Sequence, residues 1–211
     1  MKEIVKSADG ISYFKGEEAI LKMVKNEYKA ITFSPNDIVV DIGANIGAFS
    51  AVAEKAARKV IAIEADSECC DVINMNVTNK TKVINAALVE PNGPKTINFY
   101  KGSMSFVSSC IAVRGREKIE VKTIGIDKIL ACNPTILKVD IEGHEYNWID
   151  TIAFPKSVKQ MAIELHLQKK DMTEKHDRAM ANILKQGFKE IDQHTTKAYG
   201  VVTAKSYVFT R

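Results

Sequence analysis

D-I-V-V-D-I-G-A-N-I-G-A-F-S, residues 37–50, decides the fold of this 211-residue chain. Its β-branched run Ile38–Val40 predicts a strand buried on both faces, as in a parallel sheet. Asp41 closes the strand, and Gly43 and Gly47 allow a tight turn. Helical spacing follows at Phe49, Val52, Ala53 and Ala56. The stretch therefore predicts a strand, a Gly-rich loop and a helix whose free N-terminal N–H groups suit a polar ligand.

The loop lacks both common phosphate-binding patterns, since neither G-x-x-x-x-G-K-S/T nor G-x-G-x-x-G is present. Asp41 at the strand end would repel a pyrophosphate but could bind the ammonium of an amino-acid moiety. Glu64 ends the next apolar run, residues 60–63, where a carboxylate can accept both hydroxyls of a ribose. A ligand with an ammonium at one end and a ribose at the other is S-adenosylmethionine.

Composition indicates one α/β domain that folds without disulfides. The chain is 45% hydrophobic and 27% charged, enough to bury a full core. Its net charge of +4 is spread along its length, so no basic patch for nucleic acid is evident, although RNA is not excluded as a partner. Four cysteines without a C-x-x-C pair favour a reduced, cytoplasmic protein. No apolar run approaches the ~20 residues of a membrane span, so no membrane partner is expected.

Alternating strand and helix signals continue along the chain, with an N-terminal arm and covering helix over residues 1–34 and a cofactor-binding domain over residues 35–211. Helices are predicted at 16–30, after a cap at Asp66 or Ser67, at 127–131, and after a capping box at 171–174. Strands are predicted at 82–87, 96–100, 118–124, 135–141, 159–166, 188–192 and 206–210. Residues 101–115 are predicted to form a mobile loop over the site, and residues 194–200 to join the last strands in a hairpin. This order predicts an open sheet with helices on both faces.

A second acidic motif follows the strand at 135–141, where Asp140 and Glu142 lead through a turn into a predicted helix. The strand at 159–166 ends at His166 and should lie parallel beside it, with both carboxyl ends near the cofactor. Asp140, Glu142 and His166 are therefore the candidate catalytic residues, supplying a general base or holding a divalent cation, with His144 as a further member. The alternative is that none of the three takes part in the chemistry. In that case Asp140 only orients the cofactor, Glu142 caps a helix, and His166 is a loop residue whose hydrogen bonds are made within the protein.

The motifs V-V-D-I-G-A-N-I-G-A-F-S and L-K-V-D-I-E-G-H-E, about 90 residues apart, resemble those of the FkbM family of class I S-adenosylmethionine-dependent methyltransferases. The similarity runs from about Asp37 to His166 and includes A-I-E-A-D-S and V-K-T-I-G-I-D between the motifs. The resemblance implies a Rossmann-like fold with an open seven-stranded, mostly parallel sheet whose last strand is antiparallel. It also implies O-methylation of a hydroxylated small molecule such as a sugar or secondary metabolite.

By the same resemblance, the cofactor contacts divide among three parts of the ligand. The methionine part would be held by Asp41, Gly43, Asn45 and Gly47, the ribose by Glu64 and the adenine by Asn85 and Ala86, with Ala44, Ala65 and Asp140 completing the set. His144 departs from the family pattern, which has a small residue there. Since the domain carries almost no additional helices, a second subunit could complete its acceptor site in a homodimer.

Two other functions stay open on the sequence. An RNA methyltransferase would use the same cofactor half, but should add a basic face, a binding domain or an Asn/Asp-Pro-Pro-aromatic loop, none of which is in the sequence. A non-catalytic cofactor-binding module would lose the acids at the strand ends, and here Asp41, Glu64, Asp140 and Glu142 are all present.

Overall fold

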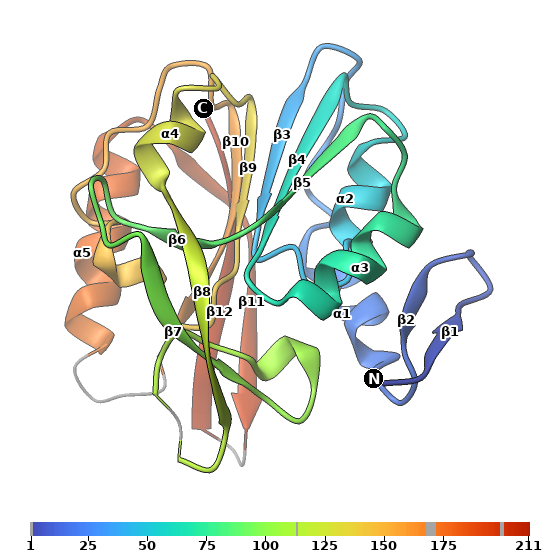
Figure 1. Cartoon of the computed structure of the whole chain (residues 1–211). Coiled ribbons are helices and arrows are strands. Elements are labelled where there is room, and N and C mark those ends of the chain that lie inside the picture. Colours follow the sequence, from blue (N-terminus) through green and yellow to red (C-terminus); the bar gives the residue numbers. More distant parts are fainter. Residues whose placement is uncertain (1, 113, 168–171, 199–200) are drawn as a thin grey trace.

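A seven-stranded sheet forms the centre of the computed structural model, which describes residues 2–112, 114–167, 172–198 and 201–211 (Figure 1). The strand order is β11-β12-β10-β9-β3-β4-β5, and β12 alone runs antiparallel to its neighbours. The strands are β3 (Ile38–Ile42), β4 (Lys59–Glu64), β5 (Thr81–Asn85), β9 (Ile136–Val139), β10 (Gln160–His166), β11 (Lys189–Ala198) and β12 (Val201–Thr210). The predicted open, mostly parallel sheet with an antiparallel last strand is confirmed.

Helices cover both faces of the sheet, as predicted (Figure 1). One face carries α1 (Ala19–Glu27), α2 (Ala48–Ala53) and α3 (Ser67–Asn76), and the other carries α4 (Ile126–Leu130) and α5 (Met172–Lys185). The carboxylate of Asp66 caps α3 by accepting a hydrogen bond from the Glu68 backbone N–H at 3.0 Å. No helix among the described residues is long and apolar enough to span a membrane.

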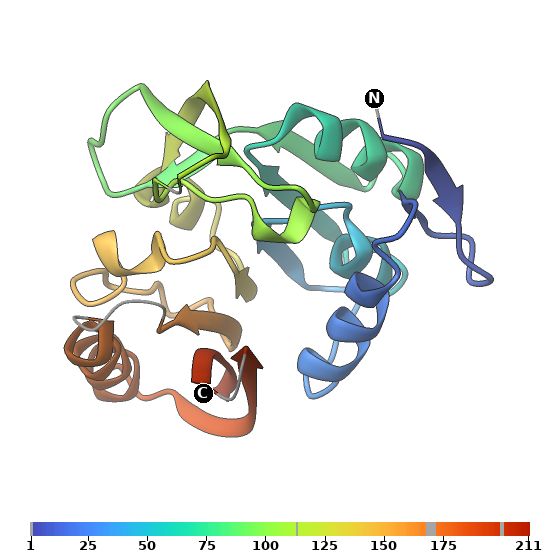
Figure 2. The same ribbon diagram turned by 90° about the horizontal axis from the view of Figure 1, so that it is seen from below.

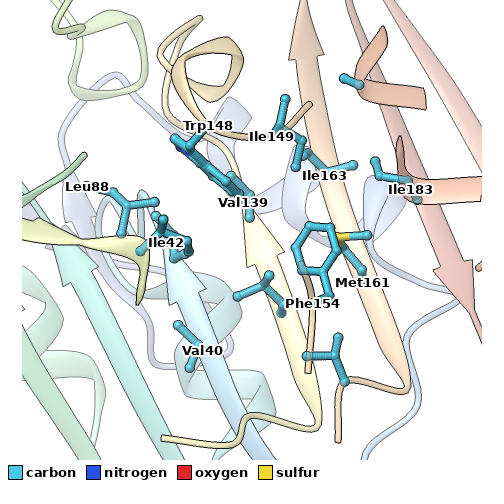
Figure 3. Packing of buried hydrophobic residues seen from close by; sticks show 14 of the residues in the cluster. Val40, Ile42, Leu88, Val139, Trp148, Ile149, Phe154, Met161, Ile163 and Ile183 are labelled. Atoms are coloured by element: carbon cyan, nitrogen blue, oxygen red, sulfur yellow. The ribbon is translucent and has the colours of Figure 1, made fainter. Parts of the chain in front are cut away.

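Alternate residues of the central strands pack on opposite faces, as the two-residue period of a strand requires. Val39 of β3 packs with Tyr28 and Phe49 on the face covered by α1 and α2. Its neighbour Val40 belongs to the larger core on the other face, which surrounds the fully buried Trp148 (Figure 3). The continuous apolar run at Ile38–Val40 therefore reflects burial on both sides of the sheet, the reason it predicts a parallel strand.

Two small sheets flank the main one. A hairpin of β1 (Ile4–Lys6) and β2 (Ser12–Phe14) forms the N-terminal arm, and a three-stranded sheet has the order β6-β8-β7. The strands of this second sheet are β6 (Ala87–Val89), β7 (Thr96–Lys101) and β8 (Glu117–Gly125). Figure 1 shows it lying across the face of the main sheet that carries α4 and α5.

The predicted strand at 82–87 is wrong in one respect, because the structure divides it after Asn85. Asn85 pairs with Glu64, the last residue of β4. The Ala86 N–H donates to the Glu64 carbonyl at 2.9 Å and completes this last pair of the β4–β5 ladder. The chain then leaves the main sheet, and β6 pairs in parallel with β8.

Four further predictions differ from the structure or fall at least partly outside it. The helix expected after Glu142 is a 3₁₀ turn, η2 (Glu145–Asn147), because residues 142 and 143 have left-handed φ values of 54° and 96° that interrupt a helical path. Val52 was predicted in the apolar face of α2 but is 45% exposed. The capping box begins at Asp171, outside the described residues, as do residues 199–200 of the predicted hairpin.

Candidate functional site

A cleft opens at the carboxyl ends of β3, β4 and β9 and encloses about 970 Å³ of space that no protein atom occupies, counting the part open to solvent. Residues of α1 and of the segment around η1 (Ser105–Val107) both line it. Figure 2 looks toward this end of the sheet, with α1 in blue and η1 in green beside the strand ends. The sequence predicted a ligand at this edge of the sheet, and the cleft lies there.

The two sequence motifs touch at Gly43. This residue has φ 71°, and a Cβ there would lie 1.7 Å from the Asp140 carbonyl oxygen, so only glycine fits. Gly47 has φ 77° and packs against the Ile73 side chain, which a Cβ would meet at 3.0 Å. The Gly-rich loop is thus shaped by close approach to the second motif on one side and to α3 on the other.

Glu64 lines the cleft with its carboxylate held by backbone N–H groups. Oε2 accepts from Asn45 N and Oε1 from Asp66 N, both at 2.8 Å. Each oxygen keeps a further lone pair, so the carboxylate can accept hydroxyls from a ligand in the cleft. The side chain is 9% exposed, and this burial raises the pKa of Glu64 to about 7.

Asp41 was expected in the mouth of the loop, but the structure buries its side chain completely beneath the loop. Its Oδ2 accepts a hydrogen bond from Ser50 Oγ at 2.7 Å, and its Oδ1 lies 3.3 Å from Lys138 Nζ. Lys138 also donates to the Gly43 carbonyl at 2.6 Å. Burial works to lower the pKa of Lys138, but Asp41 and Asp140 raise it above its ordinary value, so the amine stays charged.

Sequence reasoning missed Lys138, although a signal was present. Lys138 stands inside the apolar run 136–141 and two residues before Asp140, so the strand period puts both side chains on one side of β9. A lysine inside a buried strand is rare without a carboxylate partner. Its position therefore indicated an ion pair with acids at the neighbouring strand ends.

The predicted cofactor residues divide into those that line the cleft and those that do not. The cleft is lined by Gly43, Ala44, Asn45, Glu64, Ala65, Ala86 and Asp140. Outside its lining are Asp41, Gly47 and Asn85. The Asn85 amide, expected to reach an adenine edge, instead donates to the carbonyls of Glu64 and Ala65 at 3.0 and 2.9 Å, and so fixes the end of β4.

The candidate catalytic residues come together as predicted, since β9 and β10 are parallel neighbours. Asp140 and Glu142 line the cleft, and His166, 4% exposed, lies behind Glu142. His166 Nε2 is 3.3 Å from Glu142 Oε2, and His166 Nδ1 is 3.0 Å from Glu145 Oε1. Burial works to lower the pKa of His166, but these two carboxylates raise it well above its ordinary value, and the ring holds a proton between them.

Two acids that sequence reasoning did not assign, Glu27 and Glu164, also line the cleft. Burial and the charge of Asp140 raise the pKa of Glu27 to about 7. Glu164 is 4% exposed, and burial, followed by the charge of Asp140, raises its pKa well above the ordinary value. Glu164 lies two residues before His166 in the same strand. As with Lys138 and Asp140, this spacing puts both side chains on the same side of the strand.

In the structure, hydrogen bonds of Ser105 hold the loop predicted at 101–115 against the rest of the protein. Ser105 N and Oγ donate to the buried Glu17 carboxylate at 3.0 and 2.5 Å, and Ser105 Oγ lies 3.0 Å from Asn45 Oδ1. These contacts join the N-terminal segment, the loop and the Gly-rich turn at one point. Ordering of this loop when cofactor and acceptor bind remains a prediction.

An open sheet of this strand order, with an antiparallel β12 and a cleft at the carboxyl ends of β3, β4 and β9, is the fold of the class I methyltransferases. Residues 41–190 match the profile of the methyltransferase FkbM domain. Because this match covers more than half of the chain, the protein belongs to the FkbM methyltransferase family. No curated protein matches the chain.

Solved structures share the fold at low sequence identity. Methyltransferase FkbM from Methylobacillus flagellatus is 18% identical with a TM-score of 0.54, over 89% of this chain and 47% of that one. The M. jannaschii tRNA m1G37 methyltransferase is 16% identical with a TM-score of 0.50, over 98% of this chain and 56% of that one. M. jannaschii TYW2, in complex with AdoMet, is 19% identical with a TM-score of 0.50, over 100% of this chain and 86% of that one. This chain spans about half the length of the first two.

Proposed function

We propose that the protein transfers a methyl group from S-adenosylmethionine to a hydroxyl of a small molecule. The observation that carries the proposal is Glu64, whose carboxylate is fixed by two backbone N–H groups and keeps lone pairs facing the cleft. A carboxylate held in this way at the end of the second strand suits the two hydroxyls of a ribose. S-adenosylmethionine joins such a ribose to an ammonium and a reactive sulfonium.

The rest of the cleft offers matching groups for the other parts of that cofactor. Beside the point where the two motifs meet, Gly43, Ala44 and Asn45 line the cleft and offer backbone groups for the amino-acid end of the cofactor. The apolar residues Ala65, Ala86 and Leu88 line the cleft near Glu64 and suit the flat adenine. When bound, the cofactor supplies the electrophilic methyl group.

The acceptor end of the cleft supports a small neutral acceptor rather than RNA. Its lining includes four carboxylates, Glu27, Asp140, Glu142 and Glu164. Those of the four that are ionised repel phosphate groups, which an RNA acceptor would bring close to the reacting atom. The lining also includes the apolar side chains of Ile20, Met23 and Phe106, which suit the carbon skeleton of a small molecule.

The chain's own residues must position the acceptor and accept its proton. An acceptor oxygen attacks the methyl carbon in line with the breaking C–S bond, and the sulfur leaves as a neutral thioether. The hydroxyl proton must leave for the oxygen to react, and Glu142 is the carboxylate placed to accept it. Glu142 is held in a left-handed conformation, φ 54°, and such strain is commonly stored at functional sites.

The acceptor class is tested by incubating the protein with methyl-labelled cofactor and either a panel of hydroxylated small molecules or total RNA. Label is expected in one or more small molecules and not in RNA. Label in RNA alone would overturn the acceptor proposal in favour of RNA methylation. Cofactor binding without transfer to any acceptor would favour a non-catalytic binding module.

Glu142→Gln should reduce kcat by about 100- to 10,000-fold, the usual contribution of a positioned general base, because an amide accepts no proton. The affinity for S-adenosylmethionine should stay unchanged, since Glu142 is not among the proposed cofactor contacts. Steady-state kinetics and calorimetry measure the two quantities separately. Glu117→Gln, at an exposed position of β8, is the matched control. Full activity in Glu142→Gln would mean that another group accepts the proton of the acceptor hydroxyl.

A further inference from the structure

We propose that Asp140, Glu164 and His166 bind a divalent cation at the carboxyl ends of β9 and β10. Each residue offers one ligand atom, and these atoms all lie within 4.8 Å of one another. Two carboxylates and an imidazole form a ligand set that suits a divalent transition metal such as Mn²⁺. The inference concerns the same cleft as the proposed function and rests on it for the role of the ion.

Backbone pairing sets the spacing of these three residues. β9 and β10 are parallel, with Val139 opposite Ile163, so the next residues, Asp140 and Glu164, emerge side by side at the strand ends. Glu164 and His166 are two residues apart on one strand and project to the same side. The cluster is therefore built on the rigid edge of the sheet, which favours a fixed coordination geometry.

The two carboxylates of the group are only partly satisfied by the described residues. Asp140 Oδ2 lies 3.8 Å from Lys138 Nζ, but Asp140 Oδ1 is buried and has no hydrogen-bond partner among the described residues. Glu164 is 4% exposed, yet its hydrogen bond from Thr196 Oγ1 is long, at 3.5 Å. Burying a carboxylate without a close partner is costly unless a cation compensates for its charge.

A buried carboxylate holds His166 in the orientation that a metal ligand needs. Glu145 is fully buried, and its Oε1 accepts from the backbone N–H groups of Ile141 and Gly143 at 3.2 Å each and lies 3.0 Å from His166 Nδ1. Nε2 is thereby left facing Glu142. A carboxylate behind a ligating histidine is a recurrent feature of metal sites, where it fixes the ring and its tautomer.

The predicted cation site differs in membership from the one expected on the sequence. Glu164 joins Asp140 and His166, whereas His144 stands apart, with its ring nitrogens 3.3 and 3.4 Å from the Asn147 amide. Glu142 is 3.3 Å from His166 but outside the group.

In the transfer step the cation would polarise the acceptor hydroxyl and lower its pKa. The hydroxyl proton passes to Glu142, the oxygen forms a bond to the methyl carbon, and the C–S bond of the sulfonium breaks. The products are the methyl ether, S-adenosylhomocysteine and the proton, which Glu142 returns to water. No oxidant or further reactant is needed.

The test is a titration of the chelator-treated full chain with Mn²⁺, followed by electron paramagnetic resonance without cofactor. One Mn²⁺ per chain is expected. Glu164→Gln, which keeps the shape of the side chain, should weaken Mn²⁺ binding by at least about 10- to 100-fold, the loss seen even for supporting residues of metal sites. His144→Asn, at a cleft histidine outside the group, is the matched control and should bind Mn²⁺ as the wild type does.

Absence of stoichiometric Mn²⁺ binding, or equal affinity in Glu164→Gln, would overturn the inference. Circular dichroism of Glu164→Gln establishes that it folds, and Asp140→Asn serves as a second variant if it does not. Failure of the proposed function gives a different result: Mn²⁺ would bind as expected, while no acceptor is methylated with the ion present. Conversely, methyl transfer that continues in chelator, without bound Mn²⁺, would agree with the proposed function and contradict the proposed role of the cation.

Discussion

Lys138→Met should destabilise the protein by about 3–5 kcal/mol, because removing one partner of a buried ion pair leaves the other charge uncompensated. The side chains of Lys138 and Asp41 are 5% and 0% exposed, with Nζ 3.3 Å from Oδ1, so water cannot replace the lost amine. The Gly43 carbonyl also loses its 2.6 Å hydrogen bond. Urea unfolding followed by circular dichroism measures the change in the free energy of unfolding.

Two further variants show whether the effect comes from the ion pair. Lys82→Met, at an exposed position of β5, should change the free energy of unfolding by no more than about 0.5 kcal/mol. Adding Asp41→Asn to Lys138→Met should recover part of the lost stability, because it removes the buried negative charge that Lys138 no longer compensates. A Lys138→Met protein as stable as the wild type would mean that Asp41 is compensated by another group.

Glu64→Ala should weaken the binding of S-adenosylmethionine by about 2–4 kcal/mol, the loss expected for two charge-assisted hydrogen bonds to the ribose. Isothermal titration calorimetry measures the affinity, and Glu120→Ala, at an exposed position of β8, is the control. Because Glu64 also accepts from Asn45 N and Asp66 N, urea unfolding of the variant must show that it is folded at the assay temperature. Unchanged affinity would contradict the ribose assignment.

The raised pKa of Glu64 gives this prediction a second measurement. With a pKa of about 7 in the free protein, the carboxyl group is mostly protonated at pH 6 and mostly ionised at pH 8. Only the ionised form can accept both ribose hydroxyls, so affinity should fall as the pH falls, by roughly ten-fold between pH 8 and pH 6. Glu64→Gln cannot ionise and should lose the part of this dependence that Glu64 supplies. A wild-type affinity that is constant over this range would mean that ligand binding does not depend on the charge of Glu64.

Residue type and spacing alone determined the main strand, the turn after it and the location of the site. The β-branched run Ile38–Val40 could form a buried parallel strand, and the left-handed turn after it needed the conformational freedom of Gly43 and Gly47. Acids at the ends of the strands predicted a ligand at one edge of the sheet, and the pair of motifs identified the family. These features follow from residue type and spacing alone, because they depend on the chain's own period and torsion angles.

Only the tertiary structure decided which polar groups meet at that edge. Asp41 pairs with Lys138 beneath the loop, Asn85 turns to the carbonyls that end β4, and Glu164 joins Asp140. Each of these contacts depends on which strands are neighbours and on the residue at which a neighbouring strand ends, as does the division of the strand at 82–87. A side chain at a strand end has several polar groups within reach, and burial with a fixed partner selects among them. Sequence therefore placed the acids at the site, while packing assigned their partners.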